Sequence, residues 1–364
     1  MKCGIIYDNS KDLWHSLKNL ESVDSLSQRD FIFFPFNSGY GKQTTYYSHY
    51  KLAKEVLALK PDYLFFNAER PHPTTILNFL NILDSNYKPQ TGIRLFGNFQ
   101  ESLEDWLQAN NTLKRLSIFL SSPSESQTNF IKQFLNTTSI VHTFPHPVKK
   151  MSFDLQKRNQ VRAKLKLSAE TIFLYSGRLT LQKNIHYIFE FIGQLKKINH
   201  PLIQNGYKVF IAGPQDDKGA PALNIAPIEG TYYQKLIQSL NDYPLDIKEN
   251  IIFTGNLNRE ELEELYNAAD FLVNFSLNHA EAFGVAIAEA LSTGLPCFLS
   301  SWGGHGDFIK NFPTACFPIS PRMNQYGLNL RIDSDFLESL PKKISTLDQR
   351  IMTSKNVQHF YNDK

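Results

Sequence analysis

Apolar and polar positions alternate along the chain between two patterns. Short, nearly continuous apolar runs are separated by polar segments with apolar residues at helical spacing, and in the second half the runs lie at residues 172–176, 209–212, 251–255, 270–276 and 297–300. Such runs are typical of strands buried on both faces of a parallel sheet. The pattern therefore predicts an α/β fold with helices on both faces of the sheet and a ligand site at the carboxyl ends of the strands.

The first half of the chain repeats this alternation. Six apolar runs predict strands at residues 2–8, 31–36, 62–67, 92–97, 116–121 and 140–144. Pro145 and Pro147, followed by Lys149 and Lys150, have the composition of a linker. We therefore expect two α/β domains, residues 1–147 and 148–336, and a partly helical tail over residues 337–364.

One apolar segment of the second half carries a carboxylate in its interior. Residues 282–291 have the pattern of a buried helix that contains Glu289, and Glu281 directly precedes them. A buried carboxylate needs a partner, and a helix N-terminus attracts anions. Two interpretations are open. Either both acids bind a sugar nucleotide, or Glu289 is a structural acid paired with an arginine and Glu281 is an ordinary acid of a first helical turn.

A second polar group follows the strand predicted at residues 172–176. Gly177 permits a tight turn, and Arg178 and Lys183 lie just before a predicted helix. Arginine offers a planar fork for phosphate oxygens, and lysine offers a mobile point charge. The two cations would suit a diphosphate group bound without a metal ion, unless they are solvated surface residues.

The order of short motifs in the second half resembles one protein family. The motifs are Gly177-Arg178-Leu179 with Lys183, Ala212-Gly213-Pro214, Thr254-Gly255, Ala269-Asp270, Glu281-Ala282-Phe283-Gly284, Glu289-Ala290 and Gly294-Leu295-Pro296. From about residue 173 to residue 307, this succession is similar to the carboxyl-terminal half of the retaining glycosyltransferases of family 4, also described as glycosyl transferases group 1. The resemblance implies the GT-B fold, in which two Rossmann-like domains have parallel sheets that face each other across a cleft.

The resemblance also implies a role for each matching residue. Arg178 and Lys183, after Gly177, would hold the diphosphate of a nucleotide-sugar donor. Glu289 would bind the ribose hydroxyls, and Glu281 would bind the hydroxyls of the transferred sugar. Two further groups would complete the donor site: Ala282, Phe283, Gly284 and Val285 beside the sugar and phosphates, and Thr254, Asn256 and Leu257 at the edge of the base.

The mechanism implied by the resemblance is a front-face transfer with retention of configuration. Oxygens of the leaving phosphate accept the proton of the acceptor hydroxyl, Glu281 orients the sugar, and Arg178 with Lys183 stabilises the departing charge. Glu281 is not the nucleophile in that scheme. The donor itself is the only small molecule required, so we expect no cofactor and no metal. Asp333 and Asp335 resemble the metal-binding acids of another glycosyltransferase fold, but their polar surroundings indicate a cap or loop.

The first domain, which by resemblance would bind the acceptor, departs from the family pattern. Many relatives carry a Gly-Gly loop after the first strand, where this chain has Asp8 followed by polar residues. Gly39 and Gly41 either take over that role from another loop or form a surface turn. His72 is the nearest counterpart of the family's catalytic histidine, and a structural or solvated histidine is the alternative. The resemblance further implies that the tail, residues 337–364, packs back across this domain.

Composition excludes some partners and leaves others open. Thirty-eight basic and 35 acidic residues give a net charge of +3, which argues against a nucleic-acid binder. The basic excess lies in residues 1–150, where it would suit peripheral contact with an anionic membrane, although an ordinary solvated surface explains it as well. Cys3, Cys297 and Cys316 lack CxxC spacing, and no stretch approaches ~20 apolar residues. We therefore expect a cytoplasmic protein with reduced thiols.

These observations together predict a retaining glycosyltransferase. It would move a hexose-type sugar from a nucleoside diphosphate to a carbohydrate or lipid-linked acceptor, in the synthesis of a surface polysaccharide or glycoconjugate. Two alternatives remain: a GT-B phosphorylase or epimerase, and a non-catalytic subunit that binds sugar nucleotides or glycans within a biosynthetic complex. Slow hydrolysis of the donor in the absence of acceptor would distinguish an enzyme from a binding subunit.

Overall fold

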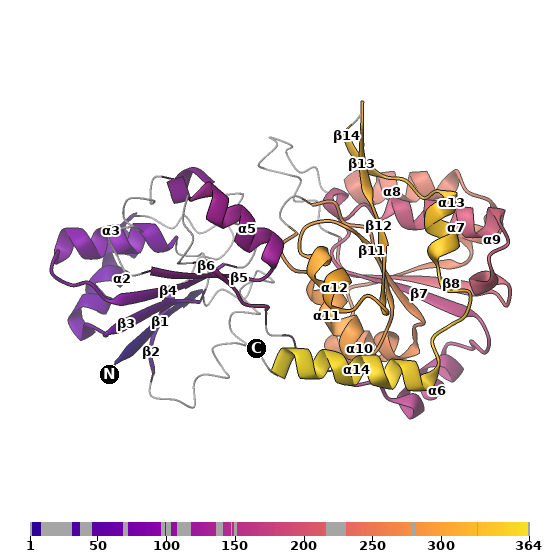
Figure 1. Cartoon of the computed structure of the whole chain (residues 1–364), viewed down its shortest axis with the longest axis horizontal. Helices are drawn as coiled ribbons and strands as arrows, with labels where there is room; N and C mark the ends of the chain where they lie inside the picture. Colours follow the sequence, from indigo (N-terminus) through magenta and orange to yellow (C-terminus); the bar gives the residue numbers. More distant parts are fainter. Residues whose placement is uncertain are drawn as a thin grey trace. The chain divides into compact units, whose positions relative to one another are not determined.

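The computed structural model divides the chain into two compact units, Met1–Pro147 and Val148–Lys364. The structure describes residues 2–8, 31–36, 46–67, 72–95, 99, 103–107, 118–135, 141–146, 148, 151–215, 231–278, 281–325 and 327–362. Gly39 and Gly41 lie outside these residues. Each unit contains a six-stranded parallel sheet, so the expected α/β fold is confirmed (Figure 1).

The sheet of the first unit has the strand order β2-β1-β3-β4-β5-β6. Its strands are β1 (Cys3–Asp8), β2 (Phe31–Phe36), β3 (Tyr63–Phe66), β4 (Gln90–Arg94), β5 (Ile118–Ser122) and β6 (Val141–Thr143). The helices described in this unit are α2 (Tyr46–Leu59), α3 (Pro73–Leu83) and α5 (Glu125–Phe134). Apolar side chains of these elements form one core, in which Phe66, Ile93, Leu120 and Trp106 are fully buried.

The sheet of the second unit has the order β12-β11-β10-β7-β8-β9. Its strands are β7 (Thr171–Ser176), β8 (Tyr207–Ala212), β9 (Ile251–Gly255), β10 (Phe271–Asn274), β11 (Cys297–Ser300) and β12 (Cys316–Ile319), and β13 (Pro321–Asn324) and β14 (Gly327–Leu330) form an antiparallel pair. The helices are α6 (Leu155–Lys164), η2 (Leu181–Lys183), α7 (His186–Lys197), η3 (Pro201–Ile203), α8 (Thr231–Asn241), α9 (Leu245–Lys248), α10 (Arg259–Ala268), α11 (Val285–Ser292), α12 (His305–Asn311), α13 (Ser334–Ser339) and α14 (Leu347–Asn362).

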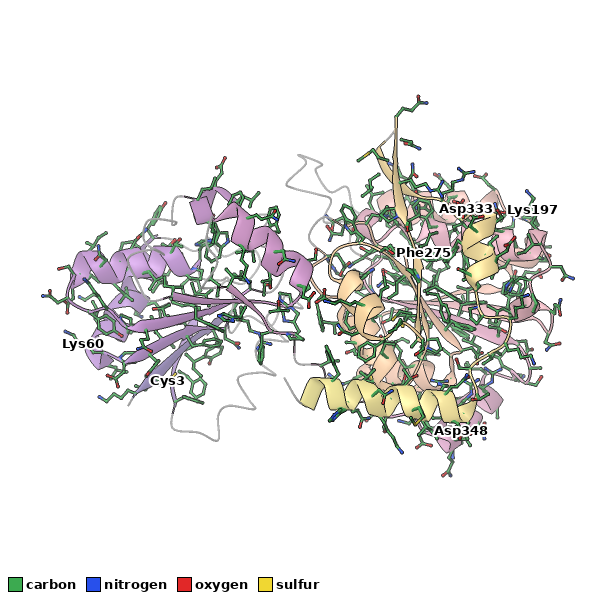
Figure 2. All side chains as sticks on the ribbon, viewed as in Figure 1. Cys3, Lys60, Lys197, Phe275, Asp333 and Asp348 are labelled. Carbon is green, nitrogen blue, oxygen red and sulfur yellow. The ribbon has the colours of Figure 1, made fainter. Side chains whose placement is uncertain are left out.

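Alternation of side chains along each strand explains why this second sheet is apolar on both faces. Phe173 and Tyr175 of β7 join a core with α7, α8 and α13, whereas Ile172 and Leu174 join a core with α10, α11 and α14. The helices accordingly lie on the two faces of the sheet (Figure 1). Phe275, just after β10, is fully buried among the side chains of this interior (Figure 2). The near-continuous apolar runs of the sequence therefore correspond to strands covered on both faces.

Local signals at the helix ends agree with the sequence. Asn258 caps α10 through a capping box with Glu261, in which each side chain bonds the other residue's backbone amide. Asp333, expected to be a cap or loop residue, caps α13 by accepting from the amide of Phe336 at 3.1 Å. Cys297 and Cys316 are buried on neighbouring strands, and burial raises the pKa of Cys316 to about 12. Every helix in the described part of the chain is too short or too polar to span a membrane.

The last helix is fastened to the second unit by a buried arginine. Arg350 of α14 is 3% exposed and donates to the carbonyl oxygens of Ala269 at 2.8 Å, Tyr266 at 3.2 Å and Thr293 at 3.3 Å. Its guanidinium carbon also lies 4.2 Å from the centre of the Phe153 ring. These carbonyls lie in the last turn or at the C-cap of α10 and α11, where helix geometry leaves acceptors without intrahelical partners. Arg350 therefore ties three helices together.

Replacing Arg350 should weaken the second unit. An Arg350→Met variant removes this donor from the buried carbonyl oxygens of Tyr266 and Thr293, so we expect it to lose about 3 kcal/mol of unfolding free energy. Hydrogen exchange of peptides from β10 and α11, followed against urea, would measure the loss within this unit. Arg322→Met is a matched control, because the Arg322 side chain is 52% exposed in its ion pair with Asp333 and should contribute at most about 1 kcal/mol. Equal effects of the two substitutions would contradict the role of Arg350.

Candidate functional site

The polar residues singled out in the second half follow two neighbouring strands. Chain order reverses direction in this sheet between β7 and β10, which pair in parallel. In open α/β sheets the crevice at such a reversal, beyond the carboxyl ends of the strands, is the usual ligand site. Gly177 and Arg178 follow β7, and the loop with Glu281 follows β10. Residues about a hundred positions apart in the sequence are thus brought to one edge of the sheet.

The turn after β7 is held against the turn after β8 by close backbone contacts. Gly177 donates to the carbonyl of Ala212 at 3.0 Å, and Leu179 donates to that of Pro214 at 2.8 Å. A Cβ at Gly213 would lie 1.9 Å from the carbonyl oxygen of Gly177, so only glycine fits there. Arg178 is exposed at this turn, and its carbonyl accepts from the Tyr175 hydroxyl at 2.9 Å. The turn therefore presents the Arg178 side chain from a rigid backbone.

Lys183 and Glu281 form an ion pair between the two loops. Lys183 ends the short helix η2, and its Nζ donates to Oε2 of Glu281. The two side chains are 16% and 9% exposed, respectively. Ser276, after β10, strengthens this junction by donating through its hydroxyl to the carbonyl of Gln182 at 3.3 Å. The pair therefore joins the segment that follows β7 to the segment that follows β10.

Glu281 remains ionised although it is buried. Burial raises its pKa, but the charge of Lys183, the electrostatic effect of the His305 ring and hydrogen bonds from Lys183 and Ser276 outweigh this effect and lower the pKa to about 2. A carboxylate in this state only accepts hydrogen bonds. Glu281 is thus suited to accept from hydroxyl groups and unsuited to act as a proton donor near neutral pH.

The backbone beside Glu281 rests on the glycine-rich loop after β11. Gly304 donates to the carbonyl of Glu281 at 2.7 Å, and the Trp302 indole donates to the carbonyl of Asn278 at 2.8 Å. A Cβ on Gly303 would lie 2.3 Å from the carbonyl oxygen of Glu281, and one on Gly304 would lie 2.4 Å from the carbonyl carbon of Ala282. The two glycines therefore permit a backbone approach that no other residue type allows.

Helix α11 begins immediately after this contact. Gly284 is its N-cap residue with φ of +105°, a conformation that favours glycine, and no side chain among the described residues caps the helix. The first amides of a helix lack intrahelical acceptors and carry partial positive charge. Ala282 and Phe283 are buried, whereas Gly284 and Val285 are partly exposed. The helix start thus offers backbone donors to an anion or to sugar oxygens.

Glu289 lies in the second turn of the same helix and is 8% exposed. Its Oε2 accepts from the Tyr266 hydroxyl, 3.3 Å away, and burial together with this carboxylate raises the pKa of Tyr266 well above its ordinary value. Tyr266 is fully buried and holds the carboxylate from α10. The sequence pattern indicated a buried acid, but it did not identify this tyrosine as the partner of Glu289.

The remaining donor-site candidates of the second unit lie at the end of β9. Thr254 and Gly255 are its last residues, and the Thr254 hydroxyl contacts the carbonyls of Ile211 at 3.4 Å and Gly255 at 3.2 Å. Asn256 is exposed, and Leu257 is partly buried against the core. These residues lie at or just after the carboxyl end of β9, at the same edge of the sheet as the residues after β7 and β10.

Among the described residues, no cluster of three or more His, Cys, Asp or Glu side chains is arranged to hold a metal ion.

His72 belongs to the first unit, and its surroundings are described on their own. It precedes α3 as the N-cap residue, its Nδ1 lies 2.7 Å from the Thr74 hydroxyl, and its ring lies 4.8 Å from that of Trp106. Burial lowers the pKa of this imidazole, with an opposing effect of Asp105 and a further lowering by His49. His72 is therefore a neutral, partly buried side chain at neutral pH.

The chain can now be placed among known proteins. Residues 156–332 match the model of a family described as glycosyl transferases group 1. Over these residues, the chain belongs to the glycosyl transferases group 1. The resemblance of the ordered motifs to family 4 is confirmed, and the matched segment contains Gly177, Arg178, Lys183, Glu281 and Glu289.

Curated proteins are similar to part of the chain. An uncharacterized glycosyltransferase of Methanocaldococcus jannaschii is 31% identical over 169 residues, which cover 46% of this chain and 37% of the relative. The glycogen synthase of Mycobacterium tuberculosis is 31% identical over 147 residues, covering 40% of this chain and 30% of that enzyme. The chain thus spans about a third of the length of each relative.

Solved structures show the fold of the whole chain. HepE of Anabaena, in a complex with UDP, matches with a TM-score of 0.70 and 14% identity, covering 100% of this chain and 95% of HepE. Its complex with UDP-glucose matches with a TM-score of 0.66 and 14% identity, covering 99% of this chain and 94% of HepE. The chain has the GT-B fold, as expected.

Several residues of the site were missed in the sequence. Ser276, Trp302 and His305 surround the Glu281 backbone and carboxylate, and Tyr266 contacts Glu289. Ser276 and Trp302 lie in loops whose composition predicted turns alone. A polar atom within an otherwise buried helix face was the one available signal for Tyr266.

The close backbone contact at Gly304 generates a stability prediction. A Gly304→Ala substitution drives a methyl group into the backbone of Ala282 and Phe283, so we expect a loss of about 2 kcal/mol or more. Thermal unfolding would measure this loss of stability. Gly306→Ala is the matched control, since a Cβ there meets nothing within 4 Å and alanine favours the helix α12. Similar melting temperatures for both variants would show that the loop yields without cost.

The ionised state of Glu281 predicts a dependence of stability on pH. Because the folded-state pKa is lowered from 4.5 to about 2, the stabilisation is fully present above pH about 4.5 and is lost as pH falls toward 2. Unfolding free energy should lose about 2 kcal/mol from this group between pH 5 and pH 3. Denaturant unfolding of the protein and of Glu281→Gln at both pH values would test this, because the variant lacks the titrating carboxyl. Parallel losses in the two proteins would contradict the assignment.

Proposed function

We propose that the protein is a nucleotide-sugar-dependent glycosyltransferase that transfers a hexose-type sugar with retention of configuration. The observation that carries this proposal is the ionised, buried Glu281 paired with Lys183 beside the uncapped start of α11, at the strand reversal of a sheet within the group 1 family segment. Groups that accept hydrogen bonds from hydroxyls and groups that donate hydrogen bonds to anions lie there within a few residues of one another. A sugar joined to a diphosphate requires both.

The donor is held by residues from three strand ends in this proposal. Arg178, which is exposed at a rigid turn, and Lys183 bind the diphosphate. The amides of Phe283, Gly284 and Val285 add donors to phosphate and sugar oxygens. Glu289 accepts from both ribose hydroxyls, which suits a carboxylate with two oxygens. Thr254, Asn256 and Leu257 border the base, and Ala282 lines the sugar.

The charge state of Glu281 supports the front-face route. As an ionised acceptor, Glu281 orients the transferred sugar through its hydroxyls and takes no part as a proton donor. The bond from the sugar carbon to the leaving phosphate oxygen breaks as the bond to the acceptor oxygen forms on the same face. The acceptor's proton passes to the leaving phosphate, whose negative charge is stabilised by Arg178 and Lys183. The group 1 family favours this transfer over the phosphorylase, epimerase and binding-subunit alternatives.

We further propose that the donor base is uracil and that the sugar is glucose or a close analogue. Support comes from HepE of Anabaena, whose structures hold UDP, UDP-glucose, or UDP with glucose. The glycogen synthase of Mycobacterium tuberculosis is similar to 147 residues of this chain at 31% identity. A UDP-hexose therefore stands first among the donors to test.

The first unit binds the acceptor in this proposal. Several buried polar side chains lie at or near the carboxyl ends of the strands of its sheet: Asp8 on β1, Asn67 after β3, Arg94 on β4 and Ser121 on β5. Burial lowers the pKa of Arg94 to about 10, so this side chain remains a cation at neutral pH. A carbohydrate or a lipid-linked phosphate acceptor suits such a set of donors and acceptors. His72 contacts the acceptor, and surface polysaccharide or glycoconjugate synthesis is the proposed setting.

A ligand screen tests the donor class directly. Thermal unfolding is followed with UDP, GDP, ADP, CDP, dTDP and their sugar derivatives, with and without Mg²⁺, because a ligand that binds the folded state raises its stability by mass action. We expect stabilisation by UDP and UDP-glucose that does not depend on Mg²⁺ and is reduced in Glu289→Ala. No response to any nucleotide would overturn the proposed function.

Activity measurements test the individual roles. Arg178→Ala and Glu289→Ala should each lower turnover by ~10²-fold or more while leaving the fold intact, because each removes a positioned charge. Release of UDP from UDP-glucose, with and without a panel of acceptors, provides the assay. Arg331→Ala and Glu264→Ala are controls, since these residues form exposed or weakly held surface ion pairs. Unchanged turnover in both site variants would remove these residues from the donor site.

A further inference from the structure

One buried side chain of the donor region has a polar atom that the protein does not use. His305 is the first residue of α12, is 0% exposed, and has an Nε2 without a hydrogen-bond partner among the described residues. Leaving such an atom unsatisfied costs about 1–3 kcal/mol. Buried polar groups in native proteins are nearly always paired, so this atom requires an explanation.

The partners of the other ring nitrogen determine the tautomer. His305 Nδ1 lies 3.1 Å from the Ser300 hydroxyl and 3.2 Å from the Ser300 carbonyl oxygen. The Ser300 hydroxyl already donates its hydrogen to the carbonyl of Ser276 at 2.6 Å. Both Ser300 oxygens therefore act as acceptors toward the ring, so Nδ1 carries the proton. In the neutral imidazole, Nε2 is then an acceptor with a lone pair.

Burial keeps the His305 imidazole neutral at neutral pH. Burial lowers the pKa of His305, Glu281 raises it, Lys183 lowers it again, and the Ser300 carbonyl raises it, with lowering as the net effect. The ordinary pKa of 6.5 already lies below neutral pH. Nε2 is therefore available as an acceptor, and a ligand that would satisfy it must supply an O–H or N–H group.

The ring lies against the start of α11. A Cβ built on Gly284 would come 3.3 Å from His305 Cδ2, which is the carbon bonded to Nε2. The backbone before the ring follows the Glu281–Phe283 segment closely, as the Gly304 contact with the Glu281 carbonyl shows. Nε2 is thus next to the N-cap residue of α11 and close to the segment that carries Glu281, where the transferred sugar is proposed to bind.

We propose that His305 Nε2 accepts a hydrogen bond from one hydroxyl of the transferred sugar and thereby selects the donor by that hydroxyl. This inference rests on the proposed function of the donor site. Glu281 and His305 together supply acceptors from two different loops to neighbouring hydroxyls. Sites built to bond a substrate hydroxyl reject analogues that lack it far more strongly than apolar pockets reject a size change.

Binding of UDP-glucose, its monodeoxy analogues and UDP to three proteins tests the inference. Calorimetry compares the unmodified protein with His305→Phe, which keeps a ring of similar size, and with His305→Gln, which keeps an acceptor near the position of Nε2. We expect the unmodified protein to bind one deoxy analogue at least tenfold more weakly than UDP-glucose. His305→Phe should bind UDP-glucose at least tenfold more weakly, without discriminating against that analogue, and should bind UDP with unchanged affinity.

Controls separate this role from a structural one. His200 is another buried histidine of the second unit, at 5% exposure, whose Nδ1 accepts from the Leu202 amide at 3.2 Å near the opposite edge of the sheet. His200→Phe should leave UDP-glucose binding and the discrimination among analogues unchanged. His305→Gln should keep part of the affinity for UDP-glucose and part of the discrimination among analogues. It provides the comparison if His305→Phe does not fold.

Each outcome decides between the proposals. If the unmodified protein binds no nucleotide, the proposed function fails and the inference fails with it. If another nucleotide binds, the same comparison uses its sugar derivative. Equal discrimination by the unmodified protein and both His305 variants would overturn the inference alone and indicate that Nε2 bonds only water. If His305→Phe loses affinity for UDP and for UDP-glucose to the same extent, the inference is also overturned, because the ring would then support the fold and would not contact the sugar.

Discussion

The ion pair between Lys183 and Glu281 is the interaction on which the candidate site depends. It joins the segment after β7 to the segment after β10, at the strand reversal where an α/β sheet leaves room for a ligand. Burial raises the pKa of the Glu281 carboxyl, and the charge of Lys183 is the largest of the effects that lower it. The ionised state of Glu281 and the position of the two loops are therefore linked, because the carboxylate depends on a cation from the other loop.

Close backbone packing fixes the segment that carries Glu281. Gly303 and Gly304 let the loop after β11 approach the backbone of Glu281 and Ala282. The same loop leads into His305, whose ring lies beside Gly284. The start of α11, the carboxylate and the imidazole consequently belong to a single layer of contacts. A layer assembled from backbone atoms has few ways to adjust, which suits a site that must hold sugar hydroxyls in fixed directions.

The sequence predicted the fold well because burial on both faces leaves a continuous apolar run at each strand, and five of the six main strands of the second unit were recognised from such runs. Strand β12 and the β13–β14 pair were missed, since residues 316–330 mix prolines, polar and apolar residues without a period. The site was predictable as far as the motifs reached: the acids, the cations and the helix start. The Lys183 to Glu281 contact, the Tyr266 partner of Glu289 and the orientation of His305 are tertiary facts that no local pattern encodes.

Arg350 has a consequence for the order in which the second unit forms during synthesis. Its guanidinium donates to the carbonyls of Tyr266 in α10 and Thr293 at the end of α11, so these two groups lack this donor until α14 has left the ribosome. The first unit has its own core and can fold earlier as an independent body. The helix that carries Glu289 therefore reaches its final packing late, and a nascent chain stalled before residue 350 would hold an unfinished donor region beside a finished first unit.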